Sequence, residues 1–205
     1  MEKDINIDVE TVNLSTEVSN VKVKKGFWGI IYEWLDSFVF AVILILLVFV
    51  FAVRVVGVNG DSMNPTLNNG DWLTVSAINT DFNRGDIVVI TQPNALNEPL
   101  IKRIIAVGGD TVDIDFNTNE VIVNGEVLDE PYINAPTASR GDFSRPIRIP
   151  EGYVFVMGDN RNNSLDSRFN DIGIIDERYI LGVANLRLYP FSEWEILLNE
   201  WKCSK

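Results

Sequence analysis

Hydrophobic and polar positions divide the chain into a polar start, one long apolar run and a remainder of short apolar or alternating segments. Residues 38–53, FVFAVILILLVFVFAV, carry no polar side chain. As a helix, sixteen residues rise about 24 Å, less than the roughly 30 Å of a bilayer's hydrocarbon core. Flanking residues extend the run to 34–58, and Trp28, Tyr32 and Trp34 suit an interface. We predict a single transmembrane helix there; a buried core helix is the alternative.

Positive charge beside the run predicts its orientation. Lys22, Lys24 and Lys25 lie just before it, whereas the next basic residue after Arg54 is Arg84. Because basic residues stay on the cytoplasmic side, we expect a single-pass protein of the cell membrane with a cytoplasmic N-terminus. Residues 1–33 are then a cytoplasmic tail and residues 59–205 an extracytoplasmic domain. The long, acidic leading segment and the absence of a small-x-small site afterwards favour an uncleaved anchor over a signal peptide.

The remainder of the chain has the pattern of short strands. They are β-branched, with Gly, Asn, Asp or Pro between them, and the sequence VNGEV predicts a hairpin with an Asn-Gly turn. No segment of helical period is long enough for a βαβ crossover, so the fold class is mainly β, with antiparallel sheets. An exposed loop is expected at 134–146, and residues 191–201 could contact the bilayer or pack as a strand or helix. Strands are predicted at 71–78, 85–91, 100–107, 111–116, 120–128, 152–158 and 180–189.

Composition excludes several kinds of chemistry. The formal net charge is −12, which argues against nucleic acid as a partner because phosphate binding needs clustered Lys and Arg. There is no histidine, so Ser-His and Cys-His hydrolases and imidazole-based zinc sites are excluded. The single cysteine, Cys203, cannot form an intramolecular disulfide, and at a fraying terminus it is a poor candidate nucleophile. We expect neither a cofactor nor a metal.

A candidate nucleophile follows the apolar run, in NGDSMNPTL. Ser62 is either an ordinary turn residue or a nucleophile, and a nucleophilic hydroxyl needs a base. Without histidine, and with the N-terminus expected across the membrane, lysine is the main candidate. Four of the seven lysines precede the run, and Lys202 and Lys205 lie within the last four residues. A Ser/Lys pair would therefore use Lys102.

The surroundings of Lys102 fit that task. In a strand, LIKRIIAV places Lys102 on the same face as Leu100, Ile104 and Ala106. Desolvation lowers a lysine pKa, and a base near neutral pH needs a fall from about 10.4 to roughly 7–8. An edge-strand lysine that keeps the sheet edge from pairing is the alternative.

A third segment, MGDNRNNSLDSR at 157–168, follows an apolar strand and is dense in acids, arginines, serines and asparagines. It is either a polar turn whose side chains bond their own backbone, or a source of a hydroxyl and a salt bridge for a site.

In this order, the three segments resemble bacterial type I signal peptidase, the membrane-bound Ser/Lys protease that removes signal peptides. GDSMNPTL is similar to the family's nucleophile motif, KRIIAVGGD to its Lys-Arg motif, and GDNRNNSLDSR to its third motif. The resemblance covers the chain from the span to about Tyr189. It implies that Ser62 is the nucleophile and Lys102 the general base. It also implies that Ser164 bonds the lysine, supported structurally by Asp166 and Arg168.

The resemblance also carries expectations about substrate. It implies exported preproteins with small-x-small cleavage sites, held extended along a strand edge near residues 54–60, with Met63 lining a pocket. Many Gram-negative members have a serine two residues before the nucleophile that helps to stabilise the oxyanion, whereas this chain has Gly60, as Gram-positive-like members do. A lost oxyanion donor typically costs about 2.7–4 kcal/mol, so another backbone donor or a water must join the Ser62 N–H. The bilayer, and the secretion machinery, are the other expected partners.

Two alternative functions stay open from the sequence. A peptidase of the same chemistry could serve one dedicated substrate, as in conjugation or pilus assembly. A membrane-anchored binding module without activity would explain the span and the β domain, but not the order of Ser62, Lys102 and Ser164. Self-cleaving repressors also carry a Ser/Lys β-domain, but they are soluble and bind DNA.

Overall fold

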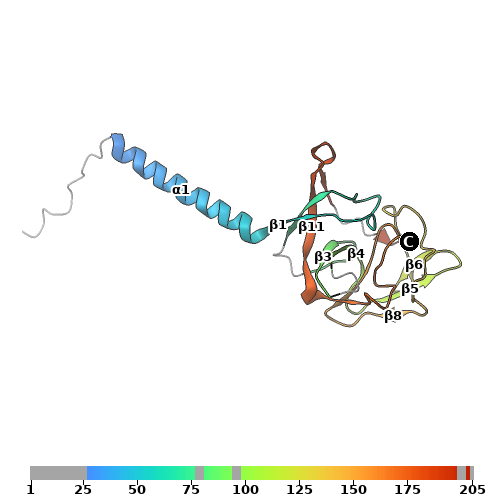
Figure 1. The fold of residues 1–205 in the computed structure, drawn as a ribbon. Coiled ribbons are helices and arrows are strands. Elements are labelled where there is room, and N and C mark those ends of the chain that lie inside the picture. Colours follow the sequence, from blue (N-terminus) through green and yellow to red (C-terminus); the bar gives the residue numbers. More distant parts are fainter. Residues whose placement is uncertain (1–26, 77–80, 94–97, 198–201, 204–205) are drawn as a thin grey trace, which may run out of the picture. The chain divides into compact units, whose positions relative to one another are not determined.

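The computed structural model describes residues 27–76, 81–93, 98–197 and 202–203. The chain separates into two units, Met1–Ile45 and Leu46–Lys205. Helix α1, Phe27–Ala52, is followed along the chain by strands (Figure 1). Its side chains are exposed from Trp34 to Leu47. Among the described residues, no helix is both long enough and apolar enough to cross a membrane.

The helix ends before the expected end of the span. Residues 53–57 form strand β1, Val53–Gly57, and not the last turn of a helix that reaches Val58. Every residue of β1 pairs with a residue of β2, from Val53 with Ser76 to Gly57 with Trp72. Three of the five residues are valines, whose branched side chains suit a strand better than a helix. The first strand therefore begins at Val53, six residues before residue 59.

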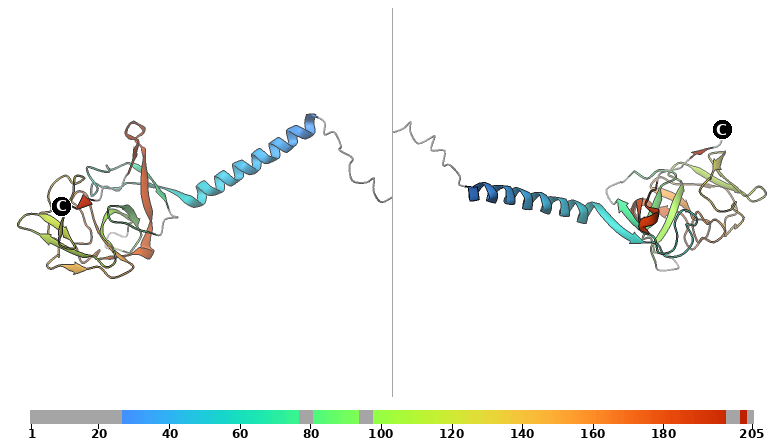
Figure 2. Two further views of the ribbon diagram at one scale, coloured as in Figure 1. Left: turned by 180° about the vertical axis from the view of Figure 1, so that it is seen from behind. Right: turned by 90° about the horizontal axis from the view of Figure 1, so that it is seen from above.

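Two antiparallel sheets form the β unit, as the sequence predicted. The first sheet has the order β1-β2-β11-β3-β4-β9-β10, with β12 paired to β11. Strand β11 is ten residues long, lies between β2 and β3, and is the long orange strand in Figure 1 and in the left view of Figure 2. The strands are β1, β2 Trp72–Ser76, β3 Ile87–Ile90, β4 Leu100–Ala106, β9 Tyr153–Met157, β10 Ile175–Asp176, β11 Ile180–Tyr189 and β12 Glu195–Ile196, with short 3-10 helices η1 Glu177–Tyr179 and η2 Phe191–Glu193.

The second sheet has five strands in the order β13-β7-β6-β5-β8. The predicted hairpin is present: Asn124 and Gly125 both have positive φ, 55° and 84°, as a two-residue Asn-Gly turn requires. Residues 134–146 form a loop without strand or helix, as expected. The strands are β5 Thr111–Asp115, β6 Glu120–Val123, β7 Glu126–Asp129, β8 Ile147–Arg148 and β13 Lys202–Cys203.

The C-terminal residues differ from expectation. Cys203 was expected at a fraying end, but it lies in β13 and pairs with Leu128 of β7. Residues 191–197 are described and contain η2 and β12. Strand β12 pairs with β11, and Leu197 packs against a buried cluster. Residues 198–201 lie outside the described part.

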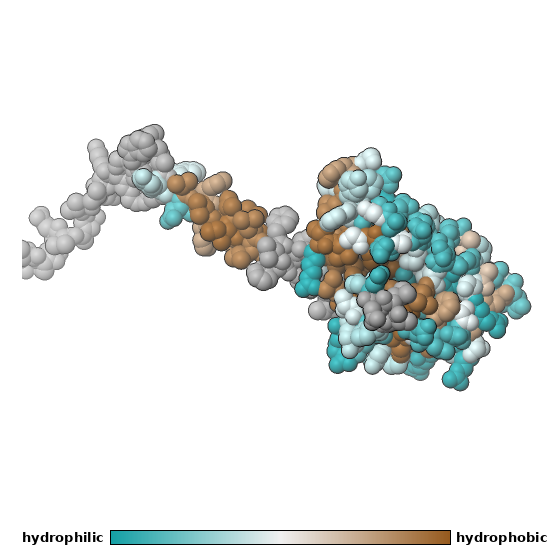
Figure 3. Space-filling model, in the orientation of Figure 1, coloured by the Kyte–Doolittle hydropathy of each residue, from teal (hydrophilic) through white to brown (hydrophobic). Residues whose placement is uncertain are grey.

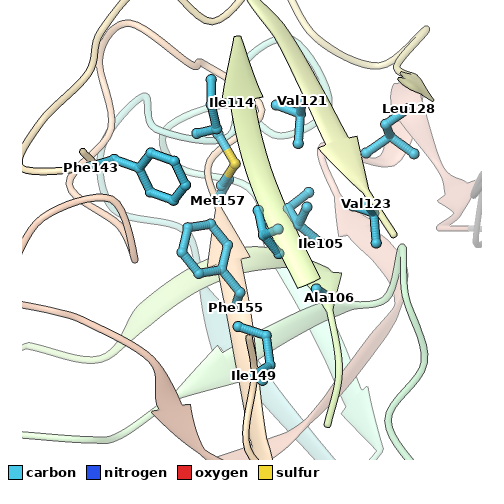
Figure 4. Packing of buried hydrophobic residues seen from close by; sticks show 11 residues of the cluster. Ile105, Ala106, Ile114, Val121, Val123, Leu128, Phe143, Ile149, Phe155 and Met157 are labelled. Atoms are coloured by element: carbon cyan, nitrogen blue, oxygen red, sulfur yellow. The ribbon is translucent and has the colours of Figure 1, made fainter. Parts of the chain in front are cut away.

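The buried core forms three clusters. The largest lies where the second sheet meets β4 and β9, and Figure 4 shows Phe143, Phe155 and Met157 packed beside Ile114. The rings of Phe143 and Phe155 meet edge to face, 6.1 Å apart. The third cluster matters for function, because it packs under the turn that carries Ser62; its members are Val58, Met63, Leu67, Leu73, Ile87 and Ala184.

Candidate active site

Ser62 lies on a turn held down by its apolar neighbours. Met63 and Leu67 are almost completely buried, and the Leu67 N–H donates to the Met63 carbonyl at 2.9 Å. Gly60 has φ +91°, which a glycine adopts without strain, and its N–H donates to Asn69 Oδ1 at 3.1 Å. Because the flanking residues are anchored, Ser62 is left half-buried, with its side chain directed at β4.

Lys102 is the group that Ser62 meets. It sits in the middle of β4, paired with Val88 of β3, and is 3% exposed. Its Nζ donates to Ser62 Oγ at 2.7 Å and to the Ile101 carbonyl at 3.0 Å. The two residues that elimination selected, forty positions apart, are therefore in direct contact. An edge-strand lysine is ruled out, because β4 lies between β3 and β9.

The environment of Lys102 changes its acidity. Burial removes water from the ammonium and lowers the pKa of Lys102 from 10.5 to about 8, although Asp166 and Asp159 act in the opposite direction through their negative charge. This value lies at the upper end of the range expected from the sequence. A substantial fraction of the amine is therefore neutral near pH 8, with a lone pair that can accept a proton.

The segment 158–168 packs behind this pair. Asp166 and Arg168 form a fully buried two-point ion pair, with both N–O distances 2.8 Å, and the Gly158 N–H donates to Asp166 at 3.0 Å. Gly158 leaves no room for a side chain, because a Cβ there would lie 2.4 Å from the Ser62 carbonyl oxygen. The Asp166–Arg168 pair thus holds the segment against the Ser62 turn, so close that only glycine fits at position 158.

Ser164 does not make the bond that the resemblance implied. Its Oγ is buried and has no hydrogen-bond partner among the described residues. A Cβ on Gly158 would lie 2.3 Å from this Oγ, so Ser164 packs against Gly158, close behind the Ser62 turn. Lys102 instead donates to Ser62 and to its own strand's backbone.

Sequence reasoning missed a second buried ion pair beside the site. Arg103 donates to both oxygens of Asp159, at 2.8 and 2.7 Å, and to the Gly85 carbonyl at 2.9 Å. The Thr66 hydroxyl donates to Asp159 at 2.5 Å. The pair thus ties together the Ser62 turn, β4 and the segment after β9. Its only sequence signal was a charged residue next to Lys102 within an apolar strand.

A cavity of about 430 Å³ opens in front of the Ser62–Lys102 contact. Its apolar lining includes Val56 at the end of β1, Met63, Ile101 and Leu165, and Gly60 also contributes. Such a lining suits a short segment with small apolar side chains. Among the described residues, no group of three or more acidic or cysteine side chains is placed to hold a metal ion.

A Ser–Lys contact at the mouth of an apolar cavity is the arrangement that a serine hydrolase with a lysine base would require. The family described as "Signal peptidase, peptidase S26" matches residues 31–189. The chain belongs to this family. It has the activity of a signal peptidase I, a serine endopeptidase that removes signal peptides, so its substrates are preproteins.

Two relatives from Bacillus subtilis agree with this assignment. Signal peptidase I S of Bacillus subtilis is 40% identical over 188 residues, which are 85% of this chain and 95% of the relative. Signal peptidase I T of the same species is 38% identical over 196 residues, 90% and 96% of the two chains. A crystal structure of a signal peptidase I from Enterococcus faecalis aligns at 28% identity, with a TM-score of 0.40 over 50% of this chain and 96% of that one.

Proposed function

We propose that this chain cleaves signal peptides with Ser62 as the nucleophile and Lys102 as the general base. The observation that carries the proposal is the 2.7 Å contact between Ser62 Oγ and Lys102 Nζ. In the neutral amine, the Ser62 O–H can donate across the same contact to the Nζ lone pair. The pKa of Lys102 near 8 makes that neutral form accessible at physiological pH.

Each proton in the reaction then passes through Lys102. As Ser62 Oγ attacks the scissile carbonyl carbon, Nζ takes the hydroxyl proton and becomes an ammonium. The tetrahedral intermediate collapses, the C–N bond breaks, and the ammonium gives that proton to the leaving amine. Water then attacks the ester, losing a proton to Lys102, which returns it to Ser62 Oγ as the acyl group leaves. No metal or cofactor is needed.

The substrate binds in the cavity beside β1. β1 is an edge strand, paired only with β2 among the described strands, so its free edge can pair with an extended peptide. Gly60 exposes backbone at this point, and Met63 fills the wall of the cavity together with Val56 and Ile101. We infer specificity for small side chains at the first and third positions before the cut.

Ser164, Asp166 and Arg168 serve as support. The buried Asp166–Arg168 pair fixes the segment that packs on the Ser62 turn. The Ser164 hydroxyl, which has no hydrogen-bond partner within the described part of the chain, packs behind that turn and would bond Nζ only if the lysine reorients.

Signal peptidases I are membrane-bound enzymes, and we further infer how this chain meets the membrane. The apolar residues 34–52 would be the anchor of a single-pass protein, with its N-terminus in the cytoplasm and the β unit outside. The exposed apolar side chains of α1 support this inference (Figure 3). The bilayer is then a partner, and the secretion machinery delivers the preprotein to the same outer surface.

The test uses purified full-length protein in detergent and an exported precursor with an Ala-x-Ala site. We expect a single cut after the final alanine, located by mass spectrometry of the new N-terminus. Ser62→Ala and Lys102→Ala should both abolish it. Cleavage that persists in Ser62→Ala would remove Ser62 from the mechanism. Folded wild-type protein that leaves several such precursors intact would instead point to one dedicated substrate.

A further inference from the structure

Asn160 makes two hydrogen bonds to the backbone on either side of Ser62. Its main-chain N–H donates to the Ser62 carbonyl at 3.0 Å. Its side-chain Nδ2 donates to the Asp61 carbonyl, also at 3.0 Å. These carbonyls belong to the two successive peptide groups that flank the Ser62 Cα, so one residue holds both peptide planes.

The bond from Asn160 Nδ2 to the Asp61 carbonyl sets the direction of the Ser62 N–H. The Asp61 carbonyl and the Ser62 N–H belong to the same planar trans peptide group and point in opposite directions. Holding the carbonyl toward Asn160 therefore points the Ser62 N–H away from Asn160. Among the described residues, no group accepts a hydrogen bond from this N–H. Asp61 and Ser62 line the cavity, whereas Asn160 does not.

The amide of Asn160 is itself held in place. Asn134, in the loop at 134–146, donates through Nδ2 to Asn160 Oδ1 at 3.0 Å. A carbonyl can only accept, so the Asp61 carbonyl requires the NH₂ side of the Asn160 amide, and Asn134 occupies the other side. The two hydrogen bonds therefore run in one direction, from Asn134 to Asn160 and from Asn160 to the Asp61 carbonyl.

We propose that Asn160 is a positioning residue that aims the Ser62 N–H at the oxyanion of the substrate. The inference rests on the proposed role of Ser62 as the nucleophile. Gly60 has no hydroxyl to contribute, so the enzyme depends more on the Ser62 N–H. A donor that is already oriented before the reaction stabilises the developing charge without reorganisation.

The test separates transition-state binding from ground-state binding. Asn160→Ala keeps the main-chain bond to Ser62 and loses both side-chain bonds, the one to the Asp61 carbonyl and the one from Asn134. We expect kcat to fall about tenfold with KM unchanged, as the loss of a hydrogen bond that acts only on the transition state would give. A peptide aldehyde ending in Ala-x-Ala forms a hemiacetal with Ser62 Oγ, and its Ki should rise about tenfold. The matching peptide alcohol, which forms no oxyanion, should keep its Ki.

Two further variants make the test specific. Asn134→Ala removes only the partner that orients the amide, so kcat and the aldehyde Ki should each change about two- to threefold. Asn117→Ala is the control: the Asn117 side chain donates to Asp115 Oδ1 in the turn between β5 and β6, and Asn117 does not line the cavity in front of Ser62. It should leave both quantities unchanged.

Each outcome has a distinct meaning. If wild-type cleavage requires Ser62, but kcat and the aldehyde Ki keep their wild-type values in Asn160→Ala and Asn134→Ala, this inference fails and the proposed function stands. Equal loss of affinity for aldehyde and alcohol also overturns it, because that indicates a general distortion of the cavity. If cleavage persists in Ser62→Ala, the proposed function fails first.

Discussion

Lys102 shows how one residue's surroundings create a base. Strand β4 places Lys102 among apolar side chains, where water cannot fully solvate its ammonium group. Its pKa of about 8 means that the amine carries a proton below that pH and loses it above. The free base, which the proposed mechanism needs, is therefore the form favoured as pH rises.

The first prediction is a pH profile. kcat/KM should rise with pH, level off above about pH 9, and fall about tenfold per pH unit below about pH 7, because only neutral Lys102 accepts the Ser62 proton. The measurement is cleavage of a soluble peptide from pH 6 to 10, with circular dichroism to verify that the protein stays folded. A profile that is flat from pH 6 to 9 would contradict a lysine base. Lys102→Arg should be inactive throughout, since a guanidinium does not deprotonate in this range.

Gly158 is the residue whose replacement tests the packing behind Ser62. In Gly158→Ala, the new Cβ would lie 2.3 Å from Ser164 Oγ and 2.4 Å from the Ser62 carbonyl oxygen, so the backbone of one segment must move. We expect kcat to fall more than about a hundredfold, because a displacement near 1 Å has such an effect on aligned groups. Gly152→Ala is the control for backbone strain without a clash: its Cβ meets nothing within 4 Å, and its φ of +78° should lower stability while activity is kept. Similar activity in both variants would show that the contact is not needed.

At the scale of elements, one buried ion pair connects three parts of the fold. Arg103 belongs to β4, Asp159 follows β9, and Thr66 belongs to the Ser62 turn. The relative positions of Ser62 and Lys102 depend on these connections, because the two residues come from different elements.

We predict that Arg103→Met destabilises the protein by about 3–5 kcal/mol, because it leaves the Asp159 carboxylate buried without its partner. The measurement is the free energy of unfolding in urea. Arg178→Met is the control, since Arg178 also pairs with an aspartate, Asp176, but its side chain is 84% exposed. That variant should behave almost like the wild type. Equal effects of the two substitutions would contradict the role of the buried pair.

At the scale of the molecule, the β unit exposes an apolar surface of its own. Val55, Trp72, Tyr189 and Phe191 line a shallow apolar groove with Leu188, and each of the four is about half or more exposed. Figure 3 shows hydrophobic surface beside hydrophilic surface in the region of β11. Aromatic side chains of this kind suit a membrane–water interface.

We predict that the double substitution Trp72→Asp and Phe191→Asp lowers cleavage of a precursor in lipid vesicles by about tenfold. Cleavage of a short soluble peptide in detergent should stay unchanged, because neither residue lines the cavity in front of Ser62. Tyr179→Asp, at an exposed aromatic outside this groove, is the control. Equal cleavage rates for all variants in vesicles would show that this groove does not bind the bilayer.

Much of this architecture follows from local patterns. Short β-branched segments predicted the strands, the Asn-Gly pair predicted its hairpin, and the absence of histidine left lysine as the main candidate for the base. Such signals are readable because alternation, turn geometry and residue chemistry act over a few neighbouring positions. The end of α1 was not readable, since pairing with β2, almost twenty residues later, converts Val53–Gly57 into a strand.

The sequence by itself determined the mainly β fold class and the residue types available for chemistry. Only the tertiary structure decided that Ser62 and Lys102 meet, that the lysine is buried enough to lower its pKa, and that Asn160 holds the Ser62 backbone. It also decided that Arg103 and Asp159 pair across 56 positions and that the Ser164 hydroxyl has no partner among the described residues. The physical reason is that desolvation and hydrogen-bond geometry depend on groups distant in the chain, so no local pattern contains them.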